Sequence, residues 1–289
     1  MKRIAILGCE NSHANRFLAE IKENPAYSDY EVVGVYSNEP EAAKKLGDEF
    51  GVAILPSYDA AVGKVDGIII TARDGKYHYE YAKHYIKSGI PMFIDKPITA
   101  NPDEAVEFMR ELRAGGVKFC GGSSLCQADE IIALREAVET EKDGKTMGGI
   151  VRAPLHSASE HSGIFFYAPH LVEMVSSVYG RFPSTVKAFS VEDQKTVVFR
   201  YEKYDIVGIF TENSYKYFAA RFSENGSQGG VVEGSPNWFK REFAEFDALL
   251  RGGEQHLGYD EFISSIFIID AIKKSLESGE EVAVANYKV

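Results

Sequence analysis

Short apolar runs alternate with amphipathic segments over the first 120 residues. Residues 3–7 and 66–72 are almost wholly apolar, which is typical of strands buried on both faces. Between such runs, apolar residues recur at the spacing of one helix face, as at Ala14, Phe17 and Ile21. The pattern predicts strands at 3–7, 31–36, 52–55, 66–72, 91–94 and 117–121, with helices near 14–21, 40–50, 77–87 and 101–113.

Capping residues mark the ends of two of these helices. Asn38 and Asn101 are predicted N-caps, and a proline early in the first turn follows each of them. Gly51 stands just past the end of the helix that begins near Pro40. Strands that alternate with helices of this length predict βαβ units and a doubly wound parallel sheet.

The pattern changes after Gly122. Several strand-like runs follow one another, and the short connections between them favour antiparallel pairing. We therefore predict an α/β chain with two domains, 1–122 with the parallel sheet and 123–289 with an α+β fold on an open, largely antiparallel sheet. The expected elements of the second part are helices at 129–140, 238–250 and 261–276 and strands at 150–155, 185–191, 196–201, 206–210, 217–222 and 231–233.

The composition limits the kinds of molecule that this protein can bind. The 289 residues carry 32 Lys and Arg against 43 Asp and Glu, so the formal net charge is −11. Such a chain repels nucleic acid and anionic lipid, and no apolar run approaches the length of a membrane span. The cysteines are only Cys9, Cys120 and Cys126, which argues against a disulfide framework and predicts a reducing cytoplasmic location.

The first strand-to-helix turn reads Gly8-Cys9-Glu10-Asn11-Ser12-His13. In a doubly wound fold this turn presents helix N–H groups to a phosphate, and a dinucleotide fingerprint has glycine at three places. Gly8 keeps the first, whereas Glu10 and His13 replace the others. The alternative is a plain turn with a helix cap.

The end of the second strand carries Ser37 and Asn38, where NAD-selective sites have an acidic residue for the ribose. Asn38 has the alternative role of the helix cap already described. With Glu10 placing negative charge near a pyrophosphate and Ser37 lacking a carboxylate, we expect weak cofactor affinity and no strong preference for NAD over NADP.

Two further motifs carry side chains that could take part in catalysis. Asp95-Lys96-Pro97 closes a buried strand, at the edge where open α/β sheets bind ligands. Lys96 could polarise a carbonyl or transfer a proton, the alternative being a surface ion pair. His170 and Glu173 share one helix face, which suits acid–base work with Glu173 orienting the ring; the alternative is a structural histidine. We predict no metal site.

The order of these features resembles the glucose–fructose oxidoreductase / inositol dehydrogenase (Gfo/Idh/MocA) family over nearly the whole chain. Asp95-Lys96-Pro97 is similar to the family's Glu-Lys-Pro, and His78 precedes it at a similar spacing. His170 and Glu173 match the family's His-x-x-Asp.

The resemblance implies a Rossmann-like first domain and NAD(P)-dependent hydride transfer at a sugar or cyclitol carbon, on a small polyol substrate. Lys96 would bind the reacting oxygen, His170 would exchange its proton with the help of Glu173, and the nicotinamide would lie between the strand edge and the second domain. The resemblance also points to a homodimer or higher homo-oligomer. The candidate cofactor-binding residues are Gly8, Asn11, Ser12, His13, Ser37, Asn38, Thr71, Asp95, Lys96 and Pro97.

Three departures from the family pattern keep a second function open. Two glycines of the first turn are replaced, Phe166 stands four residues before His170, where the family commonly has Asp, and the segment after Thr71 differs from the family's Thr-Pro-Asn. The alternative is a catalytically inactive ligand sensor or regulator of the same fold.

For the oligomer, we expect the contact to form through one face of the second sheet. Its strands carry large side chains at both odd and even positions, such as Phe199, Tyr201, Ile209, Phe210, Tyr217, Phe218 and Phe222.

Overall fold

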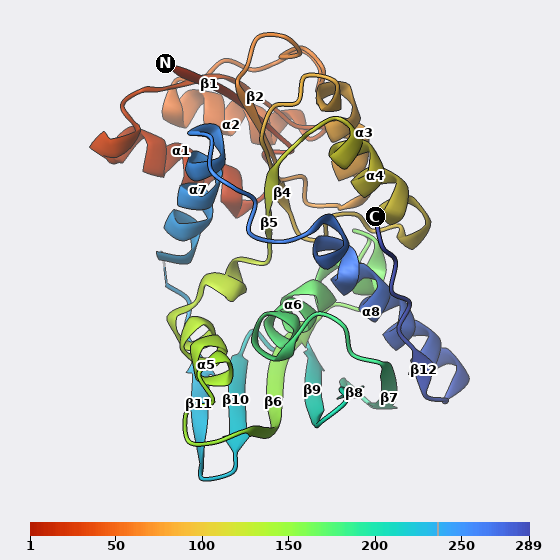
Figure 1. Cartoon of the computed structure of the whole chain (residues 1–289). Helices are drawn as coiled ribbons and strands as arrows, with labels where there is room; N and C mark the ends of the chain where they lie inside the picture. Colours follow the sequence, from red (N-terminus) through yellow and green to blue (C-terminus); the bar gives the residue numbers. More distant parts are fainter. Residues whose placement is uncertain (236) are drawn as a thin grey trace. The chain divides into compact units, whose positions relative to one another are not determined.

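A five-stranded parallel sheet forms the centre of the first part of the chain (Figure 1). The computed structural model describes residues 1–235 and 237–289. They divide into two units, Met1–Gly122 with Phe239–Tyr259 and Val289, and Ser123–Trp238 with Asp260–Lys288. The chain thus changes unit after Gly122 but returns to the first unit over Phe239–Tyr259, a segment that we had expected in the second domain.

The first sheet has the strand order β2-β1-β3-β4-β5, and every pair is parallel. Helices α1, α2 and α7 lie on one face and α3 and α4 on the other, as predicted for a doubly wound fold (Figure 1). The order reverses between β1 and β3, so ligands are expected at the carboxyl ends of these strands. The elements are β1 Lys2–Leu7, α1 Ser12–Glu23, β2 Tyr30–Tyr36, α2 Pro40–Phe50, β3 Gly67–Ile70, α3 Lys76–Ile86, β4 Met92–Asp95, α4 Pro102–Ala114, β5 Phe119–Gly122 and α7 Asn237–Leu250, with a 3-10 turn at Pro25–Tyr27.

Local signals explain most of these bounds. Asn101 caps α4 by accepting from the Asp103 N–H, and Gly51 ends α2 in the left-handed conformation. Two expectations were wrong. The N-cap of α2 is Glu39 rather than Asn38, and residues 52–55 form only a single bridge, from Ile54 to Val35, instead of a strand.

The blue helix α7 packs beside α1 because its aromatic side chains complete the core of the first unit (Figure 1). The ring of Phe243 is fully buried and lies 5.5 Å from that of Phe17 and 4.7 Å from that of Tyr27. Burial of such aromatic surface strongly stabilises a core. This packing accounts for the return of the chain to the first unit.

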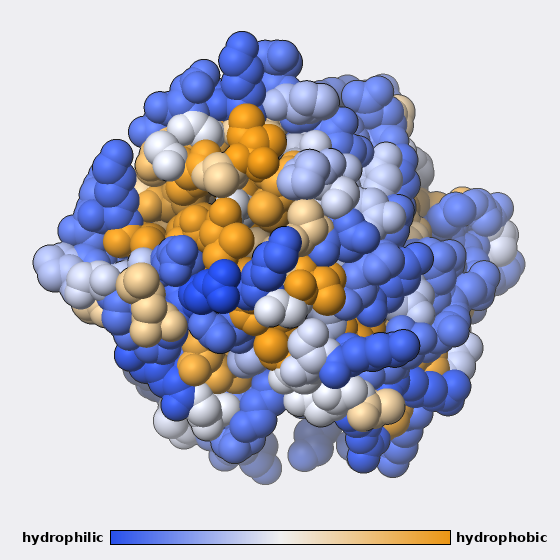
Figure 2. Space-filling model, turned by 90° about the horizontal axis from the view of Figure 1, so that it is seen from above, coloured by the Kyte–Doolittle hydropathy of each residue, from blue (hydrophilic) through white to orange (hydrophobic). Residues whose placement is uncertain are grey.

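The surface of the first unit also has a shallow apolar hollow of about 260 Å³. Leu18, Ile21, Val32, Phe50 and Val52 line it. Figure 2 shows hydrophobic residues gathered within a hydrophilic rim on the face of the molecule seen from above Figure 1. The first unit therefore exposes apolar side chains at its surface and does not bury all of them in its core.

The second unit is built on a seven-stranded, mostly antiparallel sheet in the order β11-β10-β6-β9-β8-β7-β12. Its one parallel pair among the described strands, β6 with β9, escaped prediction, because the two strands are far apart in sequence and no short connection marks the pair. The elements are α5 Asp129–Glu139, β6 Thr146–Leu155, α6 Ala168–Tyr179, β7 Thr185–Val191, β8 Gln194–Arg200, β9 Asp205–Glu212, β10 Tyr217–Ser223, β11 Gly226–Val232, α8 Tyr259–Ser278 and β12 Val282–Ala283, with 3-10 turns at Ser124–Gln127 and Gly163–Phe166.

Helices cover only one face of this second sheet. Phe199 and Phe210 point to that face and are fully buried, so our expectation that they belong to an exposed patch was wrong. Pairing in register places one row of side chains across the opposite face. That row runs Val231, Phe218, Arg152, Ile209, Thr196 and Phe189.

No helix within the described ranges has both the length and the apolar character needed to cross a membrane.

Packing of α7 leads to a first prediction. Phe243→Ala should lower the free energy of unfolding by roughly 3–5 kcal/mol, the usual cost of removing a buried ring. Lys240→Ala changes an exposed side chain of the same helix and should cost no more than about 0.5 kcal/mol. Urea unfolding of both variants measures the difference; equal costs would contradict the assignment of α7 to the core.

Candidate functional site

The turn between β1 and α1 is packed against the ends of both neighbouring strands. The Gly8 and Cys9 N–H groups donate to the carbonyl of Tyr36, over 2.8 and 3.2 Å, and the Thr71 hydroxyl donates to the Gly8 carbonyl over 2.8 Å. Gly8 has φ +75°, and a Cβ there would lie 2.3 Å from the backbone of Ala72. Glycine is therefore required at this position.

Helix α1 begins beside a hollow of about 490 Å³. Asn11 caps the helix by accepting from the His13 N–H over 2.9 Å, and Ser12 is exposed at the first helical position. Arg16 and Lys45 contribute cations to the lining. A helix N-terminus favours anions, so the turn, the hollow and the two cations fit the phosphates of a dinucleotide.

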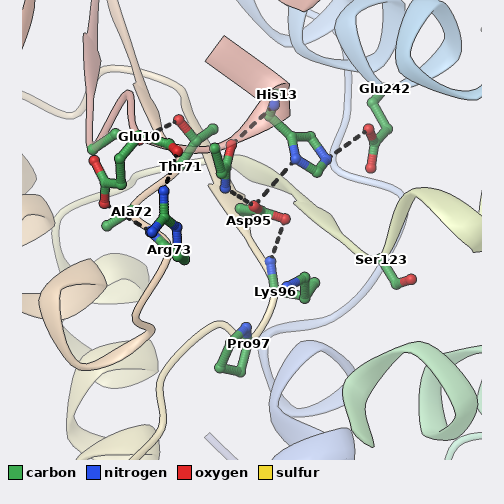
Figure 3. Close-up of polar contacts among 12 residues, drawn as sticks. Glu10, His13, Thr71, Ala72, Arg73, Asp95, Lys96, Pro97, Ser123 and Glu242 are labelled. Carbon is green, nitrogen blue, oxygen red and sulfur yellow. Dashed lines mark hydrogen bonds and ion pairs between the residues drawn. The ribbon is translucent and has the colours of Figure 1, made fainter. Parts of the chain in front are cut away.

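Glu10 occupies a place that we did not expect. Its two carboxylate oxygens accept from the Ser37 hydroxyl, over 2.6 Å, and from the Arg73 N–H, over 2.8 Å. The Arg73 guanidinium in turn donates to the Glu10 carbonyl (Figure 3). The carboxylate is thus held between the ends of β2 and β3, and Glu10 also lines the hollow at the start of α1.

His13 replaces the third glycine of the fingerprint, and its ring lies in the interior. Its Nδ1 is 3.3 Å from an Asp95 oxygen, and its Nε2 is 3.3 Å from an oxygen of Glu242 on α7 (Figure 3). The side chains of all three residues are at least 93% buried. The ring therefore connects two buried carboxylates instead of lining a cofactor site.

The charged groups in this cluster shift one another's pKa values. Burial alone would lower the pKa of the His13 imidazole, but Asp95 and Glu242 together raise it above its ordinary value. Burial raises the pKa of Glu242 to about 7, although His13 opposes this shift. The cluster therefore holds more protons near neutral pH than the same groups would hold in water.

Asp95 fixes the segment that carries Lys96. Its carboxylate accepts from the Lys96 N–H over 2.7 Å and from the Asn11 side-chain amide over 2.8 Å. Asp95 is fully buried and Lys96 is 9% exposed, so the alternative of a surface ion pair does not apply. The Lys96–Pro97 peptide bond is cis. Lys96 thus stands at the carboxyl end of β4, on a backbone attached to the start of α1.

His78 supports the same segment from α3. Its buried ring lies 2.7 Å from the Pro97 carbonyl and 2.9 Å from the Ala72 carbonyl. Burial lowers the pKa of His78, so the neutral ring can donate to only one of these oxygens. His78 therefore packs between the loop after β3 and the end of β4 and donates a hydrogen bond to one of them.

In the second unit, the two candidate residues on α6 both contact Ser123. Nδ1 of His170 lies 2.8 Å from the Ser123 hydroxyl, and the Glu173 carboxylate accepts from the Ser123 N–H over 2.6 Å. Ser123 thus contacts the imidazole and is itself held by the Glu173 carboxylate.

Aromatic rings surround His170. The rings of Tyr167 and Tyr217 lie 5.3 and 6.2 Å from the imidazole, and Phe166 packs edge-on against Tyr167. Phe166 also lies 5.2 Å from the ring of His161. The position that carries a carboxylate in the family pattern is here part of an aromatic cluster.

Three residues of these sites escaped the sequence analysis. Glu242 is more than 140 residues from Asp95 in sequence, and no local pattern marks it. Ser123 directly follows β5, and Arg73 lies three residues beyond β3. Polar residues at the carboxyl ends of parallel strands were the signal that could have identified them. Ser37 donates to Glu10, whereas Asn38 and Ser12 make no side-chain hydrogen bond to it within the described residues.

Comparison with known proteins agrees with this arrangement. The sequence model of the GFO_IDH_MocA oxidoreductase family, NAD-binding Rossmann fold, matches residues 2–122. The first part of the chain is thus similar in sequence to this family. A search among curated proteins gave no significant match.

Solved structures of the same fold cover almost the whole chain. Myo-inositol dehydrogenase from Corynebacterium glutamicum has 18% identity and a TM-score of 0.82, with 99% of this chain and 100% of that one covered. Scyllo-inositol dehydrogenase from Lactobacillus casei, solved with NAD(H) and scyllo-inositol, has 13% identity and a TM-score of 0.84, with the same coverage. The chain therefore shares the fold of these enzymes over nearly its whole length.

The His13 cluster predicts a pH-dependent stability. Both His13 and Glu242 bind protons more tightly in the folded state, so the stability that they contribute is lost as pH rises from about 5 to 8. Glu242→Gln should reduce this loss by on the order of 1–3 kcal/mol. Urea unfolding at both pH values tests this, with Glu23→Gln, an exposed change on α1, as the control. The same pH dependence in wild type and Glu242→Gln would contradict the cluster's role.

Proposed function

We propose that this protein is an NAD(P)-dependent oxidoreductase that interconverts a CH–OH group and a ketone on a sugar or cyclitol. The observation that carries the proposal is the position of Lys96. It stands at the carboxyl end of β4, one strand from the switch point, on a backbone held by buried Asp95. Open α/β sheets bind their ligands at this edge.

The cofactor would be held by residues of the first unit. The start of α1 with Arg16 and Lys45 offers donors and positive charge to the pyrophosphate, and the residues at the ends of β2 and β3 face the rest of the dinucleotide. A bound nicotinamide would supply or accept the hydride. Gly8 contributes by letting the turn approach Ala72 closely, which keeps the start of α1 at the strand ends.

The proton chemistry would belong to Lys96 and His170. Lys96 binds and polarises the reacting oxygen, and His170 gives or takes its proton, a role that suits a group titrating near neutral pH. Ser123 orients the imidazole through Nδ1, and Glu173 holds Ser123. The first unit thus serves the dinucleotide, and the second supplies the substrate side and the oligomer contact.

The choice of a polyol rests on the family and on its relatives. The Lactobacillus casei structure contains scyllo-inositol together with NAD(H). The cysteines described in the structure form no disulfide, which supports the reducing cytoplasm as the location.

We also propose that the protein forms a homo-oligomer through the open face of the second sheet. Most side chains in the row that crosses this face are apolar, and Phe189 and Val231 are at least half exposed there. Exposed apolar surface of this kind commonly marks an interface.

Lys96→Met should abolish turnover while leaving dinucleotide binding nearly intact, because the ammonium addresses the substrate oxygen. His170→Ala should lower turnover by about 10²–10⁴, the usual contribution of a general acid–base group, and flatten the pH dependence near neutrality. Single-turnover reduction of the cofactor across a panel of sugars and cyclitols measures both. Lys87→Met, an exposed lysine after α3, is the control and should leave turnover unchanged.

An active Lys96→Met variant would contradict the assigned role. A wild-type protein that binds dinucleotide but turns over no polyol would instead favour the ligand-sensor alternative.

Light scattering at micromolar concentration should give the mass of a dimer or a higher oligomer. Phe189→Lys with Val231→Lys should shift the mass toward the monomer, since both changes bury charge in the proposed contact. The control exchanges exposed charges on helix α2. Lys44→Glu with Asp48→Lys should leave the mass unchanged. A monomeric wild type would count against the interface.

A further inference from the structure

Glu10 brings a carboxylate to the end of β2. Ser37 is the first residue after this strand, and it stands where NAD-selective folds carry an acidic residue that binds the adenosine ribose. The Ser37 hydroxyl donates to the Glu10 carboxylate over 2.6 Å. The carboxylate that Ser37 lacks is therefore supplied by a neighbouring element, the β1–α1 turn.

Three hydrogen bonds hold Glu10 in place, two to its carboxylate and one to its main-chain carbonyl. The second carboxylate oxygen accepts from the Arg73 N–H, and the Arg73 guanidinium donates to the Glu10 carbonyl over 2.6 Å (Figure 3). Ser37 is 6% exposed and also accepts from the Glu39 N–H, so the hydroxyl that holds Glu10 is itself anchored. A carboxylate oxygen has more than one lone-pair direction, so bonds to Ser37 and Arg73 leave acceptor capacity for a ribose hydroxyl.

The surrounding charges disfavour a 2′-phosphate. Arg73 is the cation at this strand end, but its guanidinium is engaged by the Glu10 carbonyl and lies 3.5 Å from the Glu39 carboxylate. A phosphate on the ribose would meet Glu10 and Glu39 together, with one arginine already shared between them. Like charges at such distances repel strongly where water is partly excluded.

We propose that Glu10 is the specificity-determining residue of the cofactor site and makes the protein prefer NAD(H) to NADP(H). The inference rests on the proposed function, since it requires a bound dinucleotide. It replaces our expectation from the sequence that neither cofactor is strongly preferred, because the sequence did not show that Glu10 reaches residue 37.

The test is equilibrium binding, measured by calorimetric titration of the purified full chain with NADH and with NADPH. Wild type should bind NADH at least about tenfold more tightly, equivalent to about 1.4 kcal/mol. Glu10→Gln keeps the size of the side chain but removes the charge; its amide oxygen can still accept from the Arg73 N–H, while its NH2 group can donate to the Ser37 hydroxyl oxygen. It should lower the ratio of the two dissociation constants about tenfold, mainly by tightening NADPH binding.

Two further variants separate this role from simple repulsion or misfolding. Glu10→Gly with Ser37→Asp moves the carboxylate to the second strand and should restore the preference for NADH that Glu10→Gly alone loses. Glu49→Gln removes an exposed charge from the lining of the hollow at α1 and should leave the ratio within about twofold. The melting temperature of each variant checks that it is folded.

Several results would overturn the inference. If Glu10→Gln tightens NADH and NADPH equally, Glu10 acts only as a nearby negative charge on the pyrophosphate. If wild type binds both cofactors with the same affinity, Glu10 does not select, although the proposed function survives. If wild type binds neither, the proposed function itself fails, and the inference with it.

Discussion

The buried carboxylate of Asp95 is the interaction on which the first unit depends. It accepts from the Lys96 N–H and from the Asn11 amide, and it lies 3.3 Å from Nδ1 of His13. These donors come from the end of β4 and from the start of α1, so one group fixes the lysine and the phosphate-binding turn relative to each other. A buried carboxylate without such partners would be too costly to keep ionised, and so the donors and the acceptor constrain each other.

His13 extends this constraint to the end of the chain. Its second ring nitrogen faces Glu242 on α7, and the aromatic residues of α7 complete the core beside α1. The segment that returns to the first unit therefore contributes both packing and charge. His13 replaces the third glycine of the fingerprint, because its ring fills space in the interior that a glycine, having no side chain, would not fill.

The architecture of the first unit was predictable because each of its signals is local. Apolar runs marked the buried strands, and Asn101 and Gly51 marked helix ends with their own backbone chemistry. The strand predicted at 52–55 was wrong, because a short apolar run can rest against a sheet without pairing along its length. Phe199 and Phe210 misled because strand periodicity fixes which residues share a face, but not which face the helices cover.

The chemical groups were predictable only where a local motif marks them. Lys96 and His170 were identified from their motifs, whereas Glu242 and the contact from Glu10 to Ser37 depend on tertiary packing that no sequence spacing encodes. Phe166, where the family pattern has a carboxylate, takes part in an aromatic cluster beside His170.

The central claim is that hydride passes directly between a polyol carbon and a nicotinamide on this chain. The most direct measurement uses a panel of sugars and cyclitols deuterated at their carbinol carbons, incubated with the protein and the oxidised cofactor. Mass spectrometry of the reduced cofactor then reports transfer. The account predicts deuterium on the nicotinamide ring with at least one member of the panel. Bound cofactor that gains no deuterium from any member would contradict it.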